Sequence, residues 1–449
     1  MGRLFGTDGV RGVANTELTC ELAMNIGKAA AMVLINDEVK HPTFLIGKDT
    51  RLSGDMLEGA LIAGLCSVGA NVRLLGVIPT PAVAYLVGKY KADAGIMISA
   101  SHNPFEFNGI KIFNEDGYKL PDDLEEEIEA IVLDGKIPYS KPDFENMGTV
   151  FIETNAVADY VEHVQCTIDN DLSGLEIALD CSNGSASRTA KLLFEGLGAK
   201  CHMLSDDPNG VNINDECGST HMEHLMDYVR EHNLDAGLAF DGDADRCLAV
   251  DDNGNLVDGD YVMAICALDM KSRGKLKKDT VVGTIMTNMG FNRFCDVNEL
   301  NFVSTKVGDR YVLETMLREG YNIGGEQSGH IIFLNHATTG DGQLTGVQLL
   351  SLINRRNAKL SSLATLMERF PQVLINVKVS QEGKMRFYTD KEIKAEIKRV
   401  EEILGETGRI IVRVSGTEPL IRVMVEGEDA EKIAKLANET ADVVRDRLS

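Results

Sequence analysis

The amino-acid sequence predicts an α/β protein whose C-terminal part differs from the rest. Two observations lead to this prediction. Short β-rich runs alternate with helical patterns over most of the chain, as expected of α/β domains. After Pro371 the predicted order becomes strand, helix, two strands and helix, which indicates a small separate domain.

Length and charge narrow the class of protein further. A chain of 449 residues is too long for one hydrophobic core, and its length favours about three domains. The 45 basic and 69 acidic residues give a formal charge of −24, which repels nucleic acid and anionic membranes. A phosphorylated substrate is repelled as well, so a site for one has to gather its own arginines, lysines or metal.

The cysteines and the apolar runs indicate where the protein works. The nine cysteines include no Cys-x-x-Cys pair, which is typical of a reduced protein. The start of the chain lacks the apolar core of a signal peptide, and no uncharged apolar run reaches about 18 residues. We therefore expect a soluble, cytoplasmic protein that binds neither membrane nor nucleic acid.

The first predicted domain begins with a strand and a helix. Ser53 is the expected N-cap of this helix, residues 53–68, and Gly69 its stop signal. Another helix follows Pro81. An acidic stretch at 121–134 and a proline-containing segment at 137–144 indicate a boundary soon afterwards. The predicted strands of this part are 43–46, 72–75 and 94–98.

An internal repeat links the next two parts to the first. Residues 93–98 (DAGIMI) precede a loop with a serine, and residues 235–240 (DAGLAF) precede a loop with three aspartates. Duplicated domains explain this match, although six positions also permit chance. Ligands in open α/β sheets bind beyond the carboxyl ends of strands, where both loops lie. A third such unit is expected at about 258–359.

The remaining strands and helices complete the prediction. The strands expected in the middle of the chain are 176–179, 236–240, 247–250, 280–285, 302–305 and 331–334. The elements expected in the last domain are strands 373–379, 409–414 and 421–426, and helices 390–404 and 430–448.

The serine loop, residues 98–104 (ISASHNP), is a candidate for phosphoryl chemistry. Asn103-Pro104 favours a turn, so the hydroxyl of Ser101 is a possible phosphoryl acceptor. The alternative is a serine that only caps the backbone. A Ser101–His102 hydrolase pair is disfavoured because adjacent side chains on an extended turn are expected to diverge, and no Gly-x-Ser-x-Gly motif surrounds the serine.

The aspartate loop is a candidate metal site. Two carboxylates about 4 Å apart repel by roughly 4 kcal/mol at an effective dielectric near 20, so Asp241, Asp243 and Asp245 need a cation if they converge. Oxygen ligands favour Mg²⁺ or Ca²⁺. An EF-hand is excluded because Arg246 and Asp252 stand where that motif has Gly and Glu. A solvated acidic turn is the alternative.

Two further loops carry polar residues suited to a sugar or to a phosphate, and a third glycine-rich loop is ambiguous. Residues 324–330 (GGEQSGH) combine a carboxylate, a hydroxyl and an imidazole, which suits sugar hydroxyls, although a strand-to-strand turn explains them too. Residues 413–419 (RVSGTEP), with Arg422, form a reasonable phosphate nest, the alternative being a cap at Ser415. Residues 5–12 (FGTDGVRG) are ambiguous alone and lack the ending of a P-loop.

These five loops, in this order, resemble the α-D-phosphohexomutase superfamily over essentially the whole chain. Gly-Thr-Asp-Gly, Ser-Ala-Ser-His-Asn-Pro and Gly-Glu-Gln-Ser-Gly-His are similar to its bacterial phosphoglucosamine mutase branch. The resemblance implies three related α/β domains around a central cleft and a C-terminal TATA-box-binding-protein-like α+β domain. The predicted domains are 1–150 with the phosphoserine loop, 151–255 with the metal site, 256–368 for sugar recognition and 369–449 for phosphate binding.

The resemblance also implies a role for each matching residue. The implied catalytic residues are Ser101, Lys111, His330 and Arg11. The implied metal ligands are Asp241, Asp243 and Asp245, with Ser101 in its phosphorylated form. The implied substrate-binding residues are Arg246, Glu326, Ser328, Arg413, Ser415, Gly416, Thr417 and Arg422. An ordinary surface lysine is the alternative for Lys111.

The activity implied is the interconversion of glucosamine 6-phosphate and glucosamine 1-phosphate, which supplies amino-sugar nucleotides and cell-wall precursors. The implied cofactors are one Mg²⁺ per subunit and glucosamine 1,6-bisphosphate as intermediate and activator. Because family members are often dimers, a homodimer is implied. The alternatives are a phosphomannomutase or phosphoglucomutase, a catalytically inactive sugar-phosphate-binding protein, and a serine-phosphate phosphatase. The intact serine and aspartates disfavour the inactive protein.

Overall fold

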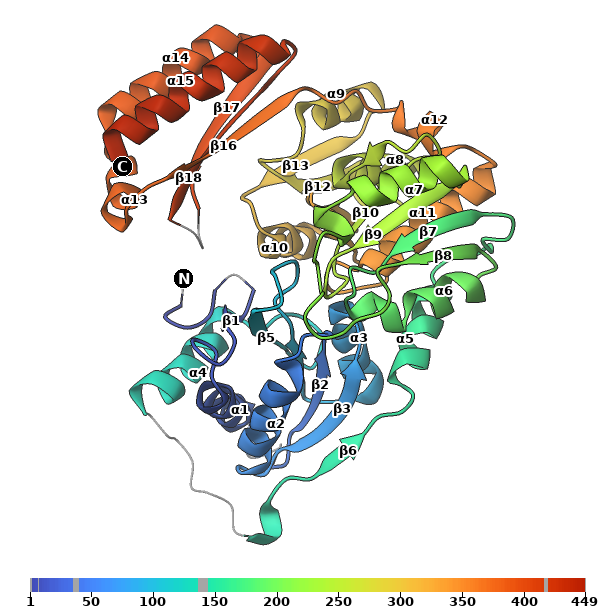
Figure 1. The fold of residues 1–449 in the computed structure, drawn as a ribbon, viewed down its shortest axis with the longest axis vertical. Coiled ribbons are helices and arrows are strands. Elements are labelled where there is room, and N and C mark those ends of the chain that lie inside the picture. Colours follow the sequence, from blue (N-terminus) through green and yellow to red (C-terminus); the bar gives the residue numbers. More distant parts are fainter. Residues whose placement is uncertain (1, 7, 35–39, 136–143, 416–418, 449) are drawn as a thin grey trace. The chain divides into compact units, whose positions relative to one another are not determined.

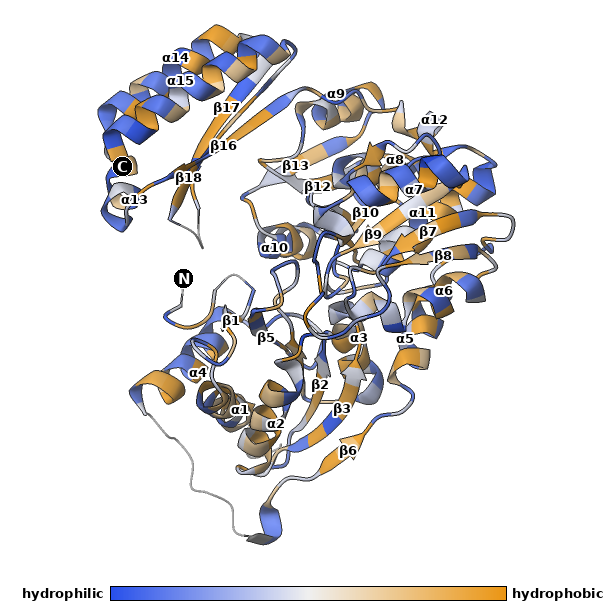
Figure 2. Ribbon diagram, viewed as in Figure 1, coloured by the Kyte–Doolittle hydropathy of each residue, from blue (hydrophilic) through white to orange (hydrophobic). Residues whose placement is uncertain are grey.

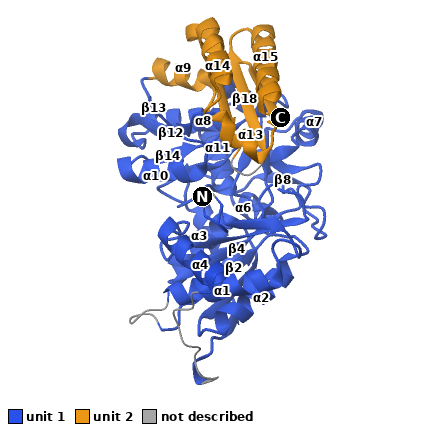
Figure 3. Ribbon diagram, turned by 90° about the vertical axis from the view of Figure 1, so that its left-hand side faces the viewer, with its two compact units in different colours: residues 1–286, 299–366 blue, residues 287–298, 367–449 orange. Residues whose placement is uncertain are grey.

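A computed structural model describes residues 2–6, 8–34, 40–135, 144–415 and 419–448 (Figure 1). The chain forms two compact units (Figure 3). Unit 1 comprises residues 1–286 and 299–366, and unit 2 comprises residues 287–298 and 367–449. No helix in the described ranges is long and apolar enough to cross a lipid bilayer.

Unit 1 contains three sheets. In spatial order, the first holds β1 (Val10–Val13), β5 (Phe107–Phe113), β4 (Ala94–Ile98), β2 (Thr43–Lys48), β3 (Asn71–Val77) and β6 (Val150–Ile152). The second holds β11 (Leu256–Val257), β10 (Cys247–Val250), β9 (Ala236–Phe240), β7 (Glu176–Asp180) and β8 (Lys200–Leu204). The third holds β13 (Asn301–Thr305), β12 (Thr280–Thr284), β14 (Ile323–Gly325) and β15 (Ile331–Phe333).

The three sheets share one four-strand plan, which confirms the predicted three related α/β domains. Their cores read β5-β4-β2-β3, β10-β9-β7-β8 and β15-β14-β12-β13. In each, the third strand along the chain pairs parallel with the first and antiparallel with the strand that follows it. The serine loop, the aspartate loop and residues 324–330, called the sugar loop from here on, therefore occupy the same hairpin in the three repeats.

The repeat in the sequence has a direct physical basis. The carboxylate of Asp93 accepts the Thr43 N–H at 2.7 Å, and that of Asp235 accepts the Glu176 N–H at 2.8 Å. Each aspartate thus fixes where its parallel strand pair begins. The glycine two residues later allows the preceding helix to approach the strand. A Cβ at Gly95 or Gly237 would lie within 3 Å of valine side chains on that helix.

Helices cover both faces of the first sheet. The first hydrophobic core joins β2, β3 and β4 to α1 (Cys20–Leu34), α2 (Gly54–Cys66) and α4 (Asp122–Asp134), whereas α3 (Thr80–Tyr90) packs on the other face. Apolar residues dominate the strands in Figure 2, and polar residues gather on the outer sides of the helices. The other helices of unit 1 are α5 (Ala156–Gln165), α6 (Ala190–Gly196), α7 (Glu223–His232), α8 (Gly259–Ser272), α10 (Asp309–Glu319), α11 (Gly342–Arg356) and α12 (Leu360–Ala364).

Unit 2 has the predicted α+β fold. An antiparallel sheet in the order β16 (Gln372–Lys378), β18 (Leu420–Gly427), β17 (Gly408–Val414) packs against α14 (Lys391–Leu404) and α15 (Ala430–Leu448). Asp390 caps α14 by accepting the N–H groups of Glu392 and Ile393. The short α13 (Gln381–Phe387) was not predicted, and α9 (Met289–Val297) also belongs to this unit.

One local prediction was wrong. Ser53 stands at the N-cap position of α2 but makes no side-chain cap, because its own backbone is already helical, with φ −73° and ψ −8°. Its hydroxyl accepts the Nδ2–H of Asn108 at 2.8 Å instead. The acidic stretch before the expected boundary contains the helix α4, Asp122–Asp134, which packs on α1. Of the expected boundary segment 137–144, residues 137–143 lie outside the described residues. The first sheet extends to Ile152 of β6, and the predicted domain limits stay a prediction.

The close helix–strand approach predicts the effect of adding one methyl group. In Gly95→Ala the Cβ would lie 2.6 Å from Val87 Cγ2, so we expect the free energy of unfolding to fall by about 1–3 kcal/mol. The matched control is Gly59→Ala in α2. There an added Cβ would have no atom within 4 Å outside the backbone of its own helix, and we expect the free energy of unfolding to rise by about 0.5–1 kcal/mol. Chemical denaturation followed by circular dichroism measures both, and equal effects would contradict the packing argument.

Candidate functional site

The hairpin loops of the three repeats meet in unit 1. The Ser101 Oγ–H of the β4–β5 loop donates to Asp241 Oδ2 of the β9–β10 loop at 2.7 Å. His330, from the β14–β15 loop, lies with Nδ1 3.6 Å from Asp245 Oδ2. The sequence predicted each loop separately, and the structure brings these residues together.

Ser101 has a strained backbone. Its φ of +54° is in the left-handed region, which a residue other than glycine rarely adopts. The residue is buried, and its hydroxyl points at the aspartate loop. Backbone strain of this kind persists only where surrounding contacts enforce it, and it is concentrated at functional sites.

His102 corrects one expectation from the sequence. Its Nδ1 lies 3.3 Å from Ser101 Oγ, so the adjacent side chains do not diverge. However, Arg246 Nη1 donates to the same nitrogen at 3.0 Å, and the Ser101 proton is directed to Asp241. Burial and the nearby Arg246 lower the pKa of His102 to about 4. The imidazole is therefore neutral near pH 7, and the geometry is not that of a serine hydrolase.

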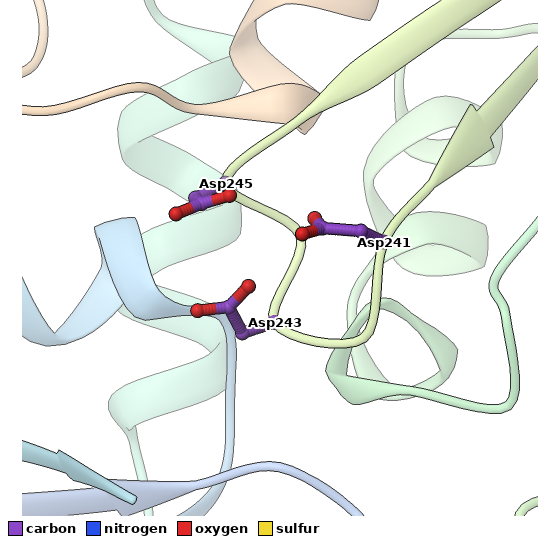
Figure 4. A group of neighbouring side chains, drawn as sticks. All are labelled: Asp241, Asp243 and Asp245. Atoms are coloured by element: carbon purple, nitrogen blue, oxygen red, sulfur yellow. The ribbon is translucent and has the colours of Figure 1, made fainter. Parts of the chain in front are cut away.

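The three aspartates converge as a metal site requires. One carboxylate oxygen from each lies within 4.8 Å of the others, and Figure 4 shows the side chains directed toward a shared space. All three are buried. Asp243 Oδ2 accepts hydrogen bonds from the Thr80 hydroxyl and the Lys111 ammonium. In contrast, Asp243 Oδ1 and Asp245 Oδ1 are buried without a hydrogen-bond partner. Unsatisfied buried carboxylate oxygens fit a hard divalent cation such as Mg²⁺.

The two outer aspartates differ in their electrostatic surroundings. Burial, together with the charges of Asp245 and Asp243, raises the pKa of Asp241 well above its usual value. Burial alone would raise the pKa of Asp245 too, but Lys111 and His330 outweigh it, and this pKa is lowered. A cation at the cluster would remove the repulsion that disfavours the charged form of Asp241.

Lys111 is not an ordinary surface lysine. Its side chain is 2% exposed, and its Nζ lies 2.7 Å from Asp243 and 2.9 Å from Asp8. Burial opposes its charge, yet Asp243 and Asp8 prevail, so the pKa of Lys111 is raised and it remains an ammonium. Arg11 pairs with Asp8 beside it. Lys111 and Arg11 thus bring positive charge to the buried carboxylates of this site.

Sequence reasoning missed three charged residues of this site: Asp8, Lys119 and Asp309. Lys119 Nζ lies 2.5 Å from Asp8 Oδ1 and 2.6 Å from Asp309 Oδ2, so it bridges the first and third sheets' domains. Asp309 Oδ2 in turn lies 3.5 Å from His330 Nε2. Asp8 stands in the start loop, but nothing local in the sequence distinguishes Lys119 or Asp309 from surface charges.

The sugar loop is held in shape by backbone contacts. Glu326 accepts the Gly308 N–H at 3.1 Å, and His330 Nε2 accepts the Gly340 N–H at 3.1 Å. The proton of a neutral His330 therefore sits on Nδ1, toward Asp245. Ser328 is exposed at the tip of the loop, where its hydroxyl is accessible.

In unit 2, two predicted phosphate-binding arginines lie opposite each other. Arg413 of β17 and Arg422 of β18 are direct cross-strand partners, so their side chains leave the same face of the sheet. The buried Ser415 donates its N–H to the Leu420 carbonyl at 2.9 Å. The other predicted members, Gly416 and Thr417, lie outside the described residues.

Comparison with known proteins follows the same division of the chain. Sequence models of phosphoglucomutase/phosphomannomutase α/β/α domains I, II and III match residues 2–137, 158–254 and 258–370, and that of the C-terminal domain matches 374–443. The chain belongs to the phosphoglucomutase/phosphomannomutase family. Within this family, it is 54% identical to a phosphoglucosamine mutase of Clostridium novyi over all of both chains.

Solved structures of the family have the same fold. A phosphoglucomutase/phosphomannomutase family protein from Burkholderia thailandensis matches with a TM-score of 0.82 and 21% identity, over 99% of this chain and 98% of that one. The N-acetylphosphoglucosamine mutase of Aspergillus fumigatus, in complex with GlcNAc-6P and magnesium, matches with a TM-score of 0.71 and 17% identity, over 99% and 96%.

The surroundings of His102 predict an unusual titration. Because its folded pKa of about 4 lies below the unfolded value near 6.5, the ring should stay neutral as the pH falls through that window, and stability should decline there. NMR of ¹⁵N-labelled histidine, assigned with His102→Gln, measures the midpoint. A midpoint near 6.5 would contradict the burial and the Arg246 contact.

Proposed function

We propose that the protein interconverts glucosamine 6-phosphate and glucosamine 1-phosphate, with Ser101 as the phosphoryl carrier. The observation that carries the proposal is the hydrogen bond from the buried Ser101 hydroxyl to Asp241 of the aspartate cluster, made by a residue whose backbone is strained. The sugar is supported by the full-length 54% identity to phosphoglucosamine mutases. A phosphomannomutase or phosphoglucomutase is the less supported alternative.

The reaction would take place in two balanced halves. First, the P–Oγ bond of phosphorylated Ser101 breaks and a P–O1 bond forms on glucosamine 6-phosphate, while the O1 proton passes to a base and Ser101 Oγ gains a proton from an acid. Glucosamine 1,6-bisphosphate then turns, its P–O6 bond breaks and the P–Oγ bond forms again, while Ser101 Oγ gives up its proton and O6 gains one. No phosphate is released, which separates this reaction from that of a phosphatase.

The residues around Ser101 supply positioning and positive charge. Phosphoryl transfer depends mainly on these two contributions. We assign Lys111 and His330 as the acid and base, because both face the aspartate cluster beside Ser101. Arg11 and Arg246 add positive charge around the transferred group. Glu326 and Ser328 are the proposed contacts to the sugar hydroxyls.

Asp241, Asp243 and Asp245, together with an oxygen of phosphorylated Ser101, would hold one Mg²⁺. The unsatisfied buried oxygens of Asp243 and Asp245 support this assignment, as does the magnesium complex of the Aspergillus enzyme. When bound, the ion would neutralise negative charge on the transferring phosphoryl group.

The phosphate that does not react is assigned to unit 2. Arg413 and Arg422 support this assignment because they are direct cross-strand partners on one face of the sheet, and paired guanidiniums suit the several oxygens of a phosphate. Ser415, Gly416 and Thr417 complete the proposed site. The homodimer, the cytoplasmic location and the bisphosphate as activator stay predictions from the resemblance.

A product assay on three sugars tests the proposed function. Glucosamine 6-phosphate should be converted to the 1-phosphate much faster than the glucose and mannose 6-phosphates, without release of inorganic phosphate. Ser101→Ala should abolish conversion while the melting temperature is retained. A preference for mannose or glucose would contradict the sugar assignment, and full activity of Ser101→Ala would contradict the carrier.

Asp243→Asn tests the metal assignment. Loss of one anionic ligand should weaken the apparent Mg²⁺ affinity at least about tenfold and lower the rate with it. Asp252→Asn is the matched control, because Asp252 pairs with Lys359 outside the cluster. Titration of activity with Mg²⁺ is the measurement, and identical curves for Asp243→Asn and the wild type would exclude this carboxylate as a ligand.

A further inference from the structure

The backbone of the serine loop is wrapped around one buried guanidinium, that of Arg51. Its side chain is fully buried, and all five of its N–H groups are used. Nε donates to Asp49 Oδ2 at 2.8 Å. Nη2 donates to the carbonyl oxygens of Ser101 at 2.9 Å and Asn103 at 2.8 Å. Nη1 donates to the carbonyl oxygen of Pro104, at the end of the loop, and to that of Phe107, the first residue of β5, at 3.1 Å.

A second donor reaches the same two carbonyls from the neighbouring repeat. Asn214 Nδ2 donates to the Ser101 oxygen at 2.9 Å and to the Asn103 oxygen at 3.0 Å. Asn214 is itself buried, and its N–H donates to the Ser182 carbonyl at 2.9 Å. A carbonyl oxygen has two lone pairs, so Arg51 and Asn214 together saturate that of Ser101.

The amide of Ser101 is held by the same network. Its N–H donates to Ser99 Oγ at 3.0 Å, and Ser99 Oγ–H donates to Asp49 Oδ2 at 2.6 Å. Both backbone polar groups of the strained residue are therefore tied to the Asp49–Arg51 pair. Because the charges of this pair offset each other, its effect on the serine loop is chiefly geometric.

The fold does not require an arginine at this place. Asp49 follows β2 and accepts the N–H of Arg51, two residues later, at 3.0 Å. In the second repeat Asp180, at the end of β7, accepts the N–H of Ser182 at 2.9 Å. The same turn is closed there with a serine in the arginine's position. In the third repeat Thr284 Oγ1, at the end of β12, accepts the Met286 N–H at 3.1 Å, so among the three repeats only the one that carries Ser101 has a guanidinium here.

We propose that Arg51 and Asn214 are positioning residues for phosphoryl transfer, and that they grip the serine loop from two repeats so that Ser101 Oγ faces the aspartate cluster. The proposal rests on Ser101 as the phosphoryl carrier. Neither side chain contacts the three aspartates or the predicted sugar loop in any described interaction. They would act through the backbone of Ser101.

Asn214→Ala tests this role, with Asn212→Ala as the matched control. Asn212 stands in the same loop and also donates through Nδ2 to a carbonyl, that of Asp207, but it does not reach the serine loop. The full-length protein is loaded with glucosamine 1,6-bisphosphate and mixed with glucosamine 6-phosphate. Quenched samples give, by intact mass, the discharge rate constant per phosphorylated molecule.

Asn214→Ala should discharge roughly 10–100-fold more slowly than the wild type, with an unchanged KM for glucosamine 6-phosphate, because misplacement costs rate more than binding. Loss of folded protein alone would lower the amount of phosphorylated protein that discharges and leave its rate constant unchanged. Asn212→Ala should match the wild type. A wild-type rate constant in Asn214→Ala would overturn the proposal.

Amide hydrogen exchange gives a readout that does not depend on activity. Amide exchange in the peptide spanning residues 99–107 should be faster in Asn214→Ala than in the wild type, and unchanged in Asn212→Ala. Unchanged exchange in Asn214→Ala would contradict the proposal that Asn214 holds the serine loop. Arg51→Lys should slow discharge further, since one ammonium cannot replace a five-donor fork. If the wild type accepts no phosphoryl group, the carrier assignment fails, whereas the exchange result still decides whether Asn214 holds the loop.

Discussion

The site depends on holding several buried carboxylates close together inside an acidic protein. Asp241, Asp243 and Asp245 repel one another, and burial together with this repulsion raises the pKa of Asp241. The fold offsets it with cations from a different repeat, above all Lys111, which reaches Asp243 and Asp245 while nearly fully buried. Removing such a cation would leave buried charge uncompensated, which is strongly destabilising. The cluster and its cations therefore have to be considered as one unit.

Repetition of one sheet plan explains how these groups come together. Each repeat ends its third strand in a hairpin, and each hairpin carries a different chemistry: a hydroxyl in the first, carboxylates in the second, a carboxylate and an imidazole in the third. Since equivalent hairpins meet, no long insertion is needed to assemble the site. Arg51 and Asn214 both donate to the carbonyl oxygen of Ser101, the residue whose backbone is strained.

The sequence predicted what is local and failed where tertiary contacts decide. Strands β4, β9 and β10 were predicted to the residue, because short apolar runs between turn signals define them. Lys119 and Asp309 were missed because only the fold brings them beside Asp8 and His330. The predicted side-chain cap at Ser53 is absent because the backbone of that residue is already helical, which the sequence does not show. Ser101 and His102 were expected to diverge because a generic extended turn was assumed, whereas the left-handed φ at Ser101 brings them within 3.3 Å.

The central claim is that Ser101 carries a phosphoryl group between two oxygens of one sugar. The most direct measurement is peptide mapping by mass spectrometry of protein treated with glucosamine 1,6-bisphosphate bearing a labelled 6-phosphoryl group, before and after addition of unlabelled glucosamine 6-phosphate. The account predicts that the label appears on the peptide containing Ser101 and then moves to the sugar without passing through free phosphate. Label on another residue, or its loss as inorganic phosphate, would contradict it.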